Sequence, residues 1–211
     1  MTGKTNFVGN ISYKEWDNLN EDRKNGIIQS DGHLNDTDGY STIKKVYSID
    51  ATDNDTVMKT LSTFAEKIRY EENEHSMVIT TDGRVFEVEG TGGVVNTELV
   101  GKDNLKRATV IHNHPIWEGW DLADSFSKDD LTFAAKYSTG KNYLVSGTFT
   151  HSFYFVNDFS EEEINLLYDA TKKIIGNRTI DTLDLTFVQL EHMRELNKLN
   201  KGVVFNENEK L

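Results

Sequence analysis

The feature that most constrains the fold is a run over residues 105–111 that leads into two histidines two positions apart, His112 and His114. The apolar residues directly before the histidines, Val110 and Ile111, are typical of a buried strand. Successive side chains of a strand point to opposite faces, so residues two positions apart share a face. The sequence therefore predicts two imidazoles on one side of a sheet, at the end of a strand, where both can reach one metal ion.

The rest of the chain predicts a mixture of helices and strands. A helix over 56–70 is indicated by apolar residues at spacings of four, three and four: Val57, Leu61, Phe64 and Ile68. Strands over 76–80 and 84–88 form a hairpin, because Gly83 tolerates the positive φ of a tight turn. Further strands are expected over 43–49, 142–146 and 151–156, and further helices over 127–137, 160–175 and 182–200. This order predicts an α/β domain with a mixed sheet flanked by helices.

Composition excludes several classes of function. The chain has 35 acidic and 23 basic residues, a formal charge of −12, so we expect no general binding of nucleic acid. The absence of cysteine excludes disulfides, cysteine-ligated zinc fingers and thiol nucleophiles. No signal peptide and no apolar run of the roughly 20 residues that span a bilayer are visible, so we expect a cytoplasmic protein without a membrane partner. Export by a specialised secretion system leaves no such signal and stays open. The sequence predicts no oligomeric state.

Two imidazoles, one carboxylate and one water form the usual catalytic zinc site. Asp130 is the best candidate for the carboxylate, because it lies in the first turn of the next helix and can point back at the strand end. Zinc lowers the pKa of a bound water from 15.7 to roughly 7, and a nearby carboxylate, here Glu74, would take and deliver the proton. Ser127 would donate a hydrogen bond to the developing oxyanion. This arrangement suits hydrolysis of an amide.

Structural interpretations exist for two of these groups. Ser127 and Asp130 also fit the N-cap and third position of an ordinary capped helix. The two roles are compatible, because capping is one way to fix a ligand. Glu74, crowded with Glu71 and Glu72 before a strand, also fits an ordinary solvated acid, and either neighbour is an alternative as the catalytic acid.

The order Glu74, His112-x-His114-Pro, Ser127-x-x-Asp130 resembles the JAMM motif of MPN/JAB-domain metallopeptidases. It is most similar to the prokaryotic and phage-type branch, which includes RadC-like proteins and domains of phage head-morphogenesis proteins and polymorphic toxins. The resemblance implies Zn²⁺ held by His112, His114 and Asp130, with Glu74 as general acid/base and Ser127 stabilising the tetrahedral intermediate. It implies cleavage of a peptide or isopeptide bond in a protein or peptide substrate, such as one that follows a ubiquitin-like C-terminal tail.

The implied fold is a curved mixed sheet flanked by helices, as in deaminase-like α/β folds. The resemblance assigns it to residues 53–211 and leaves residues 1–52 as an N-terminal extension of unknown role. The segment between the histidines and Ser127 is longer than is usual in the family. It carries Asp121 and Asp124, which are alternatives for the third ligand, and Trp117 and Trp120, which either line a substrate groove or cover the core.

Two other functions remain open. One is a catalytically silent JAB-like module that binds partners or serves a structural role in a phage or toxin system. The other is a toxin-like nuclease, against which the charge of −12 counts.

Overall fold

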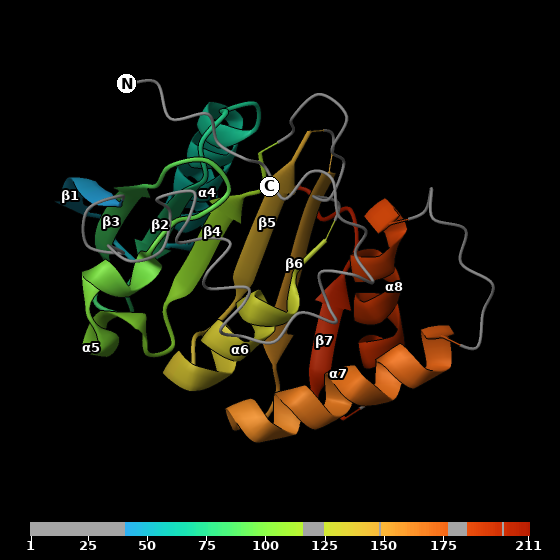
Figure 1. Ribbon diagram of the computed structural model, residues 1–211. Helices are drawn as coiled ribbons and strands as arrows, with labels where there is room; N and C mark the ends of the chain where they lie inside the picture. Colours follow the sequence, from blue (N-terminus) through green and yellow to red (C-terminus); the bar gives the residue numbers. More distant parts are fainter. Residues whose placement is uncertain (1–40, 116–124, 148, 177–184, 200) are drawn as a thin grey trace.

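A computed structural model describes residues 41–115, 125–147, 149–176, 185–199 and 201–211. These residues form one seven-stranded sheet in the order β1-β3-β2-β4-β5-β6-β7 (Figure 1). Strands β4 and β5 are parallel, and every other neighbouring pair is antiparallel. The predicted class, mixed α/β, is confirmed.

The strands are β1 (Thr42–Ser48), β2 (His75–Ile79), β3 (Arg84–Glu89), β4 (Thr109–Asn113), β5 (Asn142–Ser146), β6 (Phe149–Phe155) and β7 (Val203–Asn206). The helices are α4 (Asn54–Ile68), the 3-10 turn η2 (Thr97–Val100), α5 (Lys102–Leu105), α6 (Lys128–Tyr137), α7 (Glu161–Gly176) and α8 (Leu185–Lys198). No helix within the described ranges is long and apolar enough to cross a membrane.

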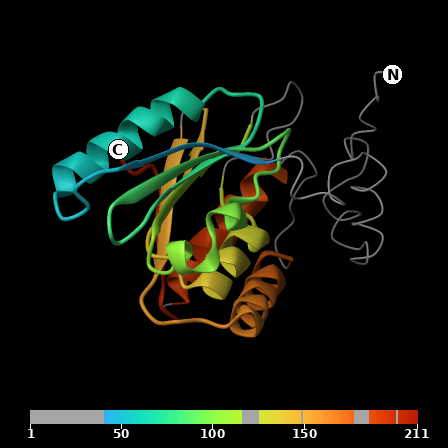
Figure 2. The ribbon, with the colours of Figure 1, turned by 90° about the vertical axis from the view of Figure 1, so that its left-hand side faces the viewer.

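Helix α4 covers one face of the sheet (Figure 2). The predicted apolar stripe is the face it buries, with Leu61, Phe64 and Ile68 in a core cluster and Val57 packed against it. From the sheet this cluster takes β2, β3, β4 and β5 side chains, including Ile111 of β4. Odd-numbered residues of β4 therefore face α4.

The opposite face of the sheet is covered by α5, α6, α7 and α8 (Figure 2). Leu131, Ala134 and Ala135 of α6 are buried against β5, β6 and β7, as the pattern of the helix predicts. Val110 of β4 lies on this face, in a cluster with α5 residues. Even-numbered residues of β4, including His112, therefore point toward α6.

The element boundaries differ from the predicted ones in instructive places. Helix α4 begins two residues early, because the side chain of Asp53 accepts from Asp55 N–H and caps it. Residues 105–108 end the short helix α5 and lead out of it, so β4 begins only at Thr109. Strand β7 was not predicted. Strand β1 precedes residue 53 and pairs with β3, so the sheet extends to both sides of the predicted domain boundary.

Candidate metal centre

The two histidines lie where β4 ends. His112 is in the strand, and His114 follows it with its N–H bonded to Val145 O at 3.1 Å. Both rings point to the α6 face, and their Nε2 atoms are 3.3 Å apart. The ring of His112 packs edge-on against Phe126, which is fully buried. The predicted alternation of side chains therefore does bring both imidazoles to one point.

The first turn of α6 carries Asp130 to the same point. Its Oδ1 is 3.2 Å from His112 Nε2, and its Oδ2 is 3.7 Å from His114 Nε2. A capping box fixes the carboxylate, because the N–H and the hydroxyl of Ser127 both donate to Oδ2 at 2.7 Å. The backbone N–H of Asp130 in turn donates to Ser127 Oγ at 3.2 Å. The capping role of Asp130 is thus compatible with a ligand role, because Oδ1 faces His112 and takes no part in the cap.

Glu74, His112 and His114 could hold a metal ion, because one ligand atom of each lies within 4.8 Å of the others, and Asp130 lies beside both rings. Ligand atoms bound tetrahedrally at 2.0–2.2 Å lie about 3.3–3.6 Å from one another. The two ring nitrogens, 3.3 Å apart, match one edge of such a tetrahedron. Asp130 approaches His112 through Oδ1 at 3.2 Å and His114 through Oδ2 at 3.7 Å, so a different oxygen faces each ring. Two nitrogens and one carboxylate oxygen are also the donor set of a catalytic zinc site, whose fourth position holds water.

Glu74 reaches the centre from a separate segment, immediately before β2. A carboxylate oxygen of Glu74 lies within 4.8 Å of ring nitrogens of both His112 and His114. The Glu74 residue is only 9% exposed, whereas Glu71 and Glu72 are exposed. Of the three adjacent acids, the structure therefore brings Glu74 to the histidines and leaves the other two at the surface.

The two carboxyl groups sit in opposite electrostatic conditions. Burial, and then the charge of Asp130, raise the pKa of Glu74 well above its ordinary value. Burial alone would also raise the pKa of Asp130, but the charges of His112 and His114 and hydrogen bonds from His112 and Ser127 outweigh it and lower that pKa. Burial lowers the pKa of His114 to about 4, so its ring is neutral and able to bind a metal at neutral pH. The surroundings thus shift the pKa values of the two carboxyl groups in opposite directions.

Ser127 is placed beside the centre, but its hydroxyl is engaged. Its single proton is donated to Asp130 Oδ2, so the hydroxyl would have to leave this bond before it could donate to a substrate oxyanion. The predicted oxyanion role stays a prediction. The alternative ligands Asp121 and Asp124, the residues Trp117 and Trp120, and most of the predicted extension, residues 1–40, lie outside the described residues.

Sequence reasoning missed Asn113, which lies between the histidines and was treated only as a spacer. Its side chain points to the α4 face and is fully buried. Oδ1 accepts the N–H of His75 at 2.7 Å, and Nδ2 donates to the carbonyl of Asn73 at 3.1 Å. The available signal was a polar residue that follows Ile111 on the buried, α4-facing side of a strand.

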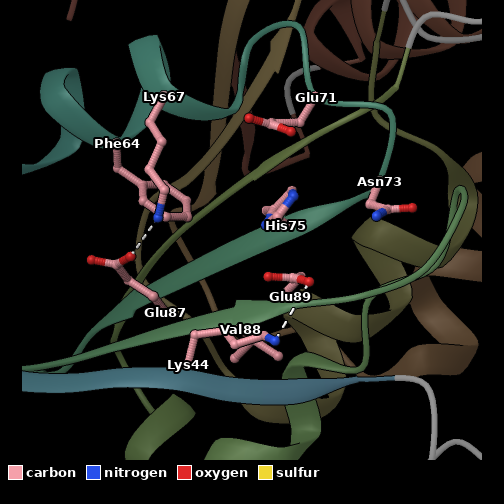
Figure 3. Close-up of a pocket in the computed structure, with 9 residues that line it drawn as sticks. All are labelled: Lys44, Phe64, Lys67, Glu71, Asn73, His75, Glu87, Val88 and Glu89. Carbon is pink, nitrogen blue, oxygen red and sulfur yellow. Dashed lines mark hydrogen bonds and ion pairs between the residues drawn. The ribbon is translucent and has the colours of Figure 1, made fainter.

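A cavity of about 350 Å³ lies on the α4 face, beyond the C-terminal end of that helix (Figure 3). His75 lies between Glu71 and Glu89, and two ion pairs cross the cavity wall: Lys67 to Glu87 at 2.9 Å and Lys44 to Glu89 at 3.5 Å. The ligand candidates point to the other face of the sheet. This cavity is therefore separate from the metal centre.

Three comparisons with known proteins complete the description of the site: no family model, no curated protein and no solved structure matches this chain.

Proposed function

We propose that this protein is a zinc-dependent hydrolase of the JAMM type that cleaves a peptide or isopeptide bond. The observation that carries the proposal is the convergence of four side chains from three separate segments. His112 lies in β4 with His114 just after it, Asp130 lies in α6, and Glu74 immediately precedes β2. Two of the three segments are held there by buried sheet pairing and by a capped helix.

In this proposal His112, His114 and Asp130 hold the ion. A bound zinc ion supplies a Lewis acid and lowers the pKa of a coordinated water to roughly 7. Glu74 accepts a proton from the attacking water as its oxygen bonds to the carbonyl carbon. Glu74 then delivers that proton to the amide nitrogen as the carbon–nitrogen bond breaks. A carboxyl group with a raised pKa suits both steps, because it is a stronger base toward water and keeps the proton it accepts until delivery.

Glu74→Gln tests the role of the acid. At saturating zinc we expect about one ion per chain in both wild type and variant, because the three proposed ligands are unchanged. Loss of a general acid/base lowers turnover by about 10²- to 10⁴-fold. The substrates are a quenched fluorescent peptide library and a matching set in which a peptide is joined to a lysine Nε, each assayed with and without a chelator.

Glu87→Gln is the matched control. Glu87 and Glu74 are equally exposed, at 9%, and lie on adjacent strands of the same sheet or at their ends. Glu87 faces the other side, where it pairs with Lys67 at 2.9 Å. The Glu87→Gln variant should therefore keep full zinc-dependent activity. A zinc-loaded wild type that cleaves neither library would contradict the hydrolase proposal and favour the catalytically silent module.

A further inference from the structure

The residue between the two metal-ligand candidates has a position that the proposed reaction does not use. Asn113 projects to the face of the sheet opposite the metal centre and is fully buried. Its amide oxygen and nitrogen bond the backbone on either side of Glu74, at His75 N–H (2.7 Å) and Asn73 C=O (3.1 Å). The reverse amide orientation would set donor against donor and acceptor against acceptor, so the bonding pattern fixes the assignment.

The ladder between β2 and β4 explains why a side chain is needed there. The last backbone pair toward Glu74 is Ser76 with His112. One step further the register sets His75 opposite Asn113, and the side chain of Asn113 replaces the backbone ladder at that step. Hydrogen bonds from Asn113 to Asn73 and His75, the two neighbours of Glu74, therefore join the backbone around Glu74 to β4.

The other side of Glu74 is held by the segment after β3. Its own N–H donates to Gly92 O at 2.6 Å, and its carbonyl accepts from Gly90 N–H at 2.8 Å. The side chain of Asn73 accepts from Gly92 N–H at 2.9 Å. These bonds fix Glu74 to the segment that follows β3, which contributes none of the proposed ligands. Asn113 supplies the connection between the acid and the strand that bears the histidines.

We infer that Asn113 is a positioning residue, which sets the carboxylate of Glu74 at its working distance from His112 and His114. This inference rests on the proposed function. Residues 112–114 would then have two roles, with the two histidine ligands on one face of the sheet and the residue that positions Glu74 on the other. A misplacement of about 1 Å in such a group can cost about 100-fold in rate. Glu74 is not one of the three proposed ligands but lies beside them, and loss of such an outer-shell partner changes metal affinity by about 10- to 100-fold. Both Glu74→Gln and Asn113→Ala should therefore raise the zinc dissociation constant.

A double-mutant cycle on zinc affinity tests the inference without any substrate. Zinc dissociation constants are measured by competition with a chromophoric chelator for wild type, Asn113→Ala, Glu74→Gln and the double variant. We expect Asn113→Ala to weaken zinc binding about tenfold when Glu74 is present. In the Glu74→Gln background the same substitution should change affinity less than about twofold, because the group it positions is gone.

Asn142→Ala is the matched control for general loss of two buried hydrogen bonds. Asn142 is buried on the neighbouring strand β5, accepts from Thr139 Oγ1 and donates to Gly140 O, and pairs with Val110 rather than with a histidine. It should leave zinc affinity unchanged in both backgrounds. Circular dichroism and thermal unfolding confirm that each variant is folded at the assay temperature.

The outcomes separate the two proposals. Equal weakening by Asn113→Ala in both backgrounds would overturn the inference, because Asn113 would then act through its histidine neighbours. No weakening in either background would overturn it as well. A wild type that binds no zinc would instead overturn the proposed function, and this inference with it. Where a cleaved peptide is known, the inference also requires Asn113→Ala to lower kcat while KM stays within about twofold.

Discussion

The capping box at α6 has a structural twin at α7, and the pair allows the two roles of Ser127 to be separated. In the α6 box, Ser127 N and Oγ lie 2.7 Å from Asp130 Oδ2, and Asp130 N lies 3.2 Å from Ser127 Oγ. In the α7 box the same three distances, between Ser160 and Glu163, are 2.8, 2.9 and 3.2 Å. Only the α6 box touches the candidate metal centre.

Replacing the serine of each box by alanine removes the same two bonds. Loss of a serine N-cap costs about 1 kcal/mol of unfolding free energy. In a domain of this size that lowers Tm by about 2–4 °C. We expect similar losses from Ser127→Ala and Ser160→Ala, with the larger one at α6, because that box is partly buried and the α7 box is exposed.

Zinc affinity should distinguish the two variants. The hydroxyl of Ser127 orients Asp130 through Oδ2, and loss of such an outer-shell partner weakens metal binding by about 10- to 100-fold. That factor corresponds to about 1.4–2.7 kcal/mol. Ser160→Ala should leave zinc affinity at the wild-type value. Ser127→Thr keeps a hydroxyl and should restore most of both properties.

Chelator competition and thermal unfolding measure the two quantities on the same preparations. If Ser127→Ala lost stability but kept wild-type zinc affinity, the reasoning that the cap orients a ligand would be refuted. If affinity were kept while turnover fell by about 10²-fold or more, the hydroxyl would act on the substrate, as the oxyanion prediction requires.

Two further predictions concern stability alone. Burial, and then the charge of Lys172, lower the pKa of His192 to about 4. Because the unfolded state binds this proton from about pH 6.5 downward, stability is complete above that pH and declines toward pH 4, by roughly 3 kcal/mol in all. Urea unfolding measures the free energy of unfolding against pH. Between pH 6 and 4.5 its slope should be smaller in His192→Gln than in wild type, by about 1.4 kcal/mol per pH unit. An unchanged slope would contradict this prediction. Gly83→Ala should cost more than about 2 kcal/mol, because φ is +85° and the new Cβ would lie 2.2 Å from Ile49 O. Gly92→Ala, where φ is +56° and no atom lies within 4 Å, should cost about 1 kcal/mol by the same measurement, and equal costs would contradict the argument.

Local patterns predicted the elements whose signal is contained in their own residues. The stripe of α4, the Gly83 hairpin and the inner face of α6 each follow from one period or one turn, and each is present. Strand β7 was not predicted, because its four residues are too few to show an alternating pattern. It is defined instead by its pairing with β6, which no local pattern contains.

The candidate site divides in the same way. That His112 and His114 share a face follows from the period of a strand, and the structure shows the same face. The strand period does not show which of the three neighbouring acids approaches the histidines. Glu71 and Glu72 differ from Glu74 only in how the chain turns before β2. That turn is fixed by contacts with residues distant in sequence, such as the bond from Glu74 N–H to Gly92 O. Asn113 was missed for the same reason, since its partners lie about 40 residues away.

The register between β2 and β4 ties these observations together. Opposite residues of an antiparallel pair share a face, so the pairing of Ser76 with His112 sets Glu74 on the side of His114. A slip of one residue would move every side chain of β2 to the other face and carry Glu74 away from the histidines. The same slip would remove His75 N–H from Asn113. The position of the acid and the clamp that holds it therefore depend on one register. That register is enforced by buried side chains on both faces, such as Met77 toward α4 and Val78 toward α5.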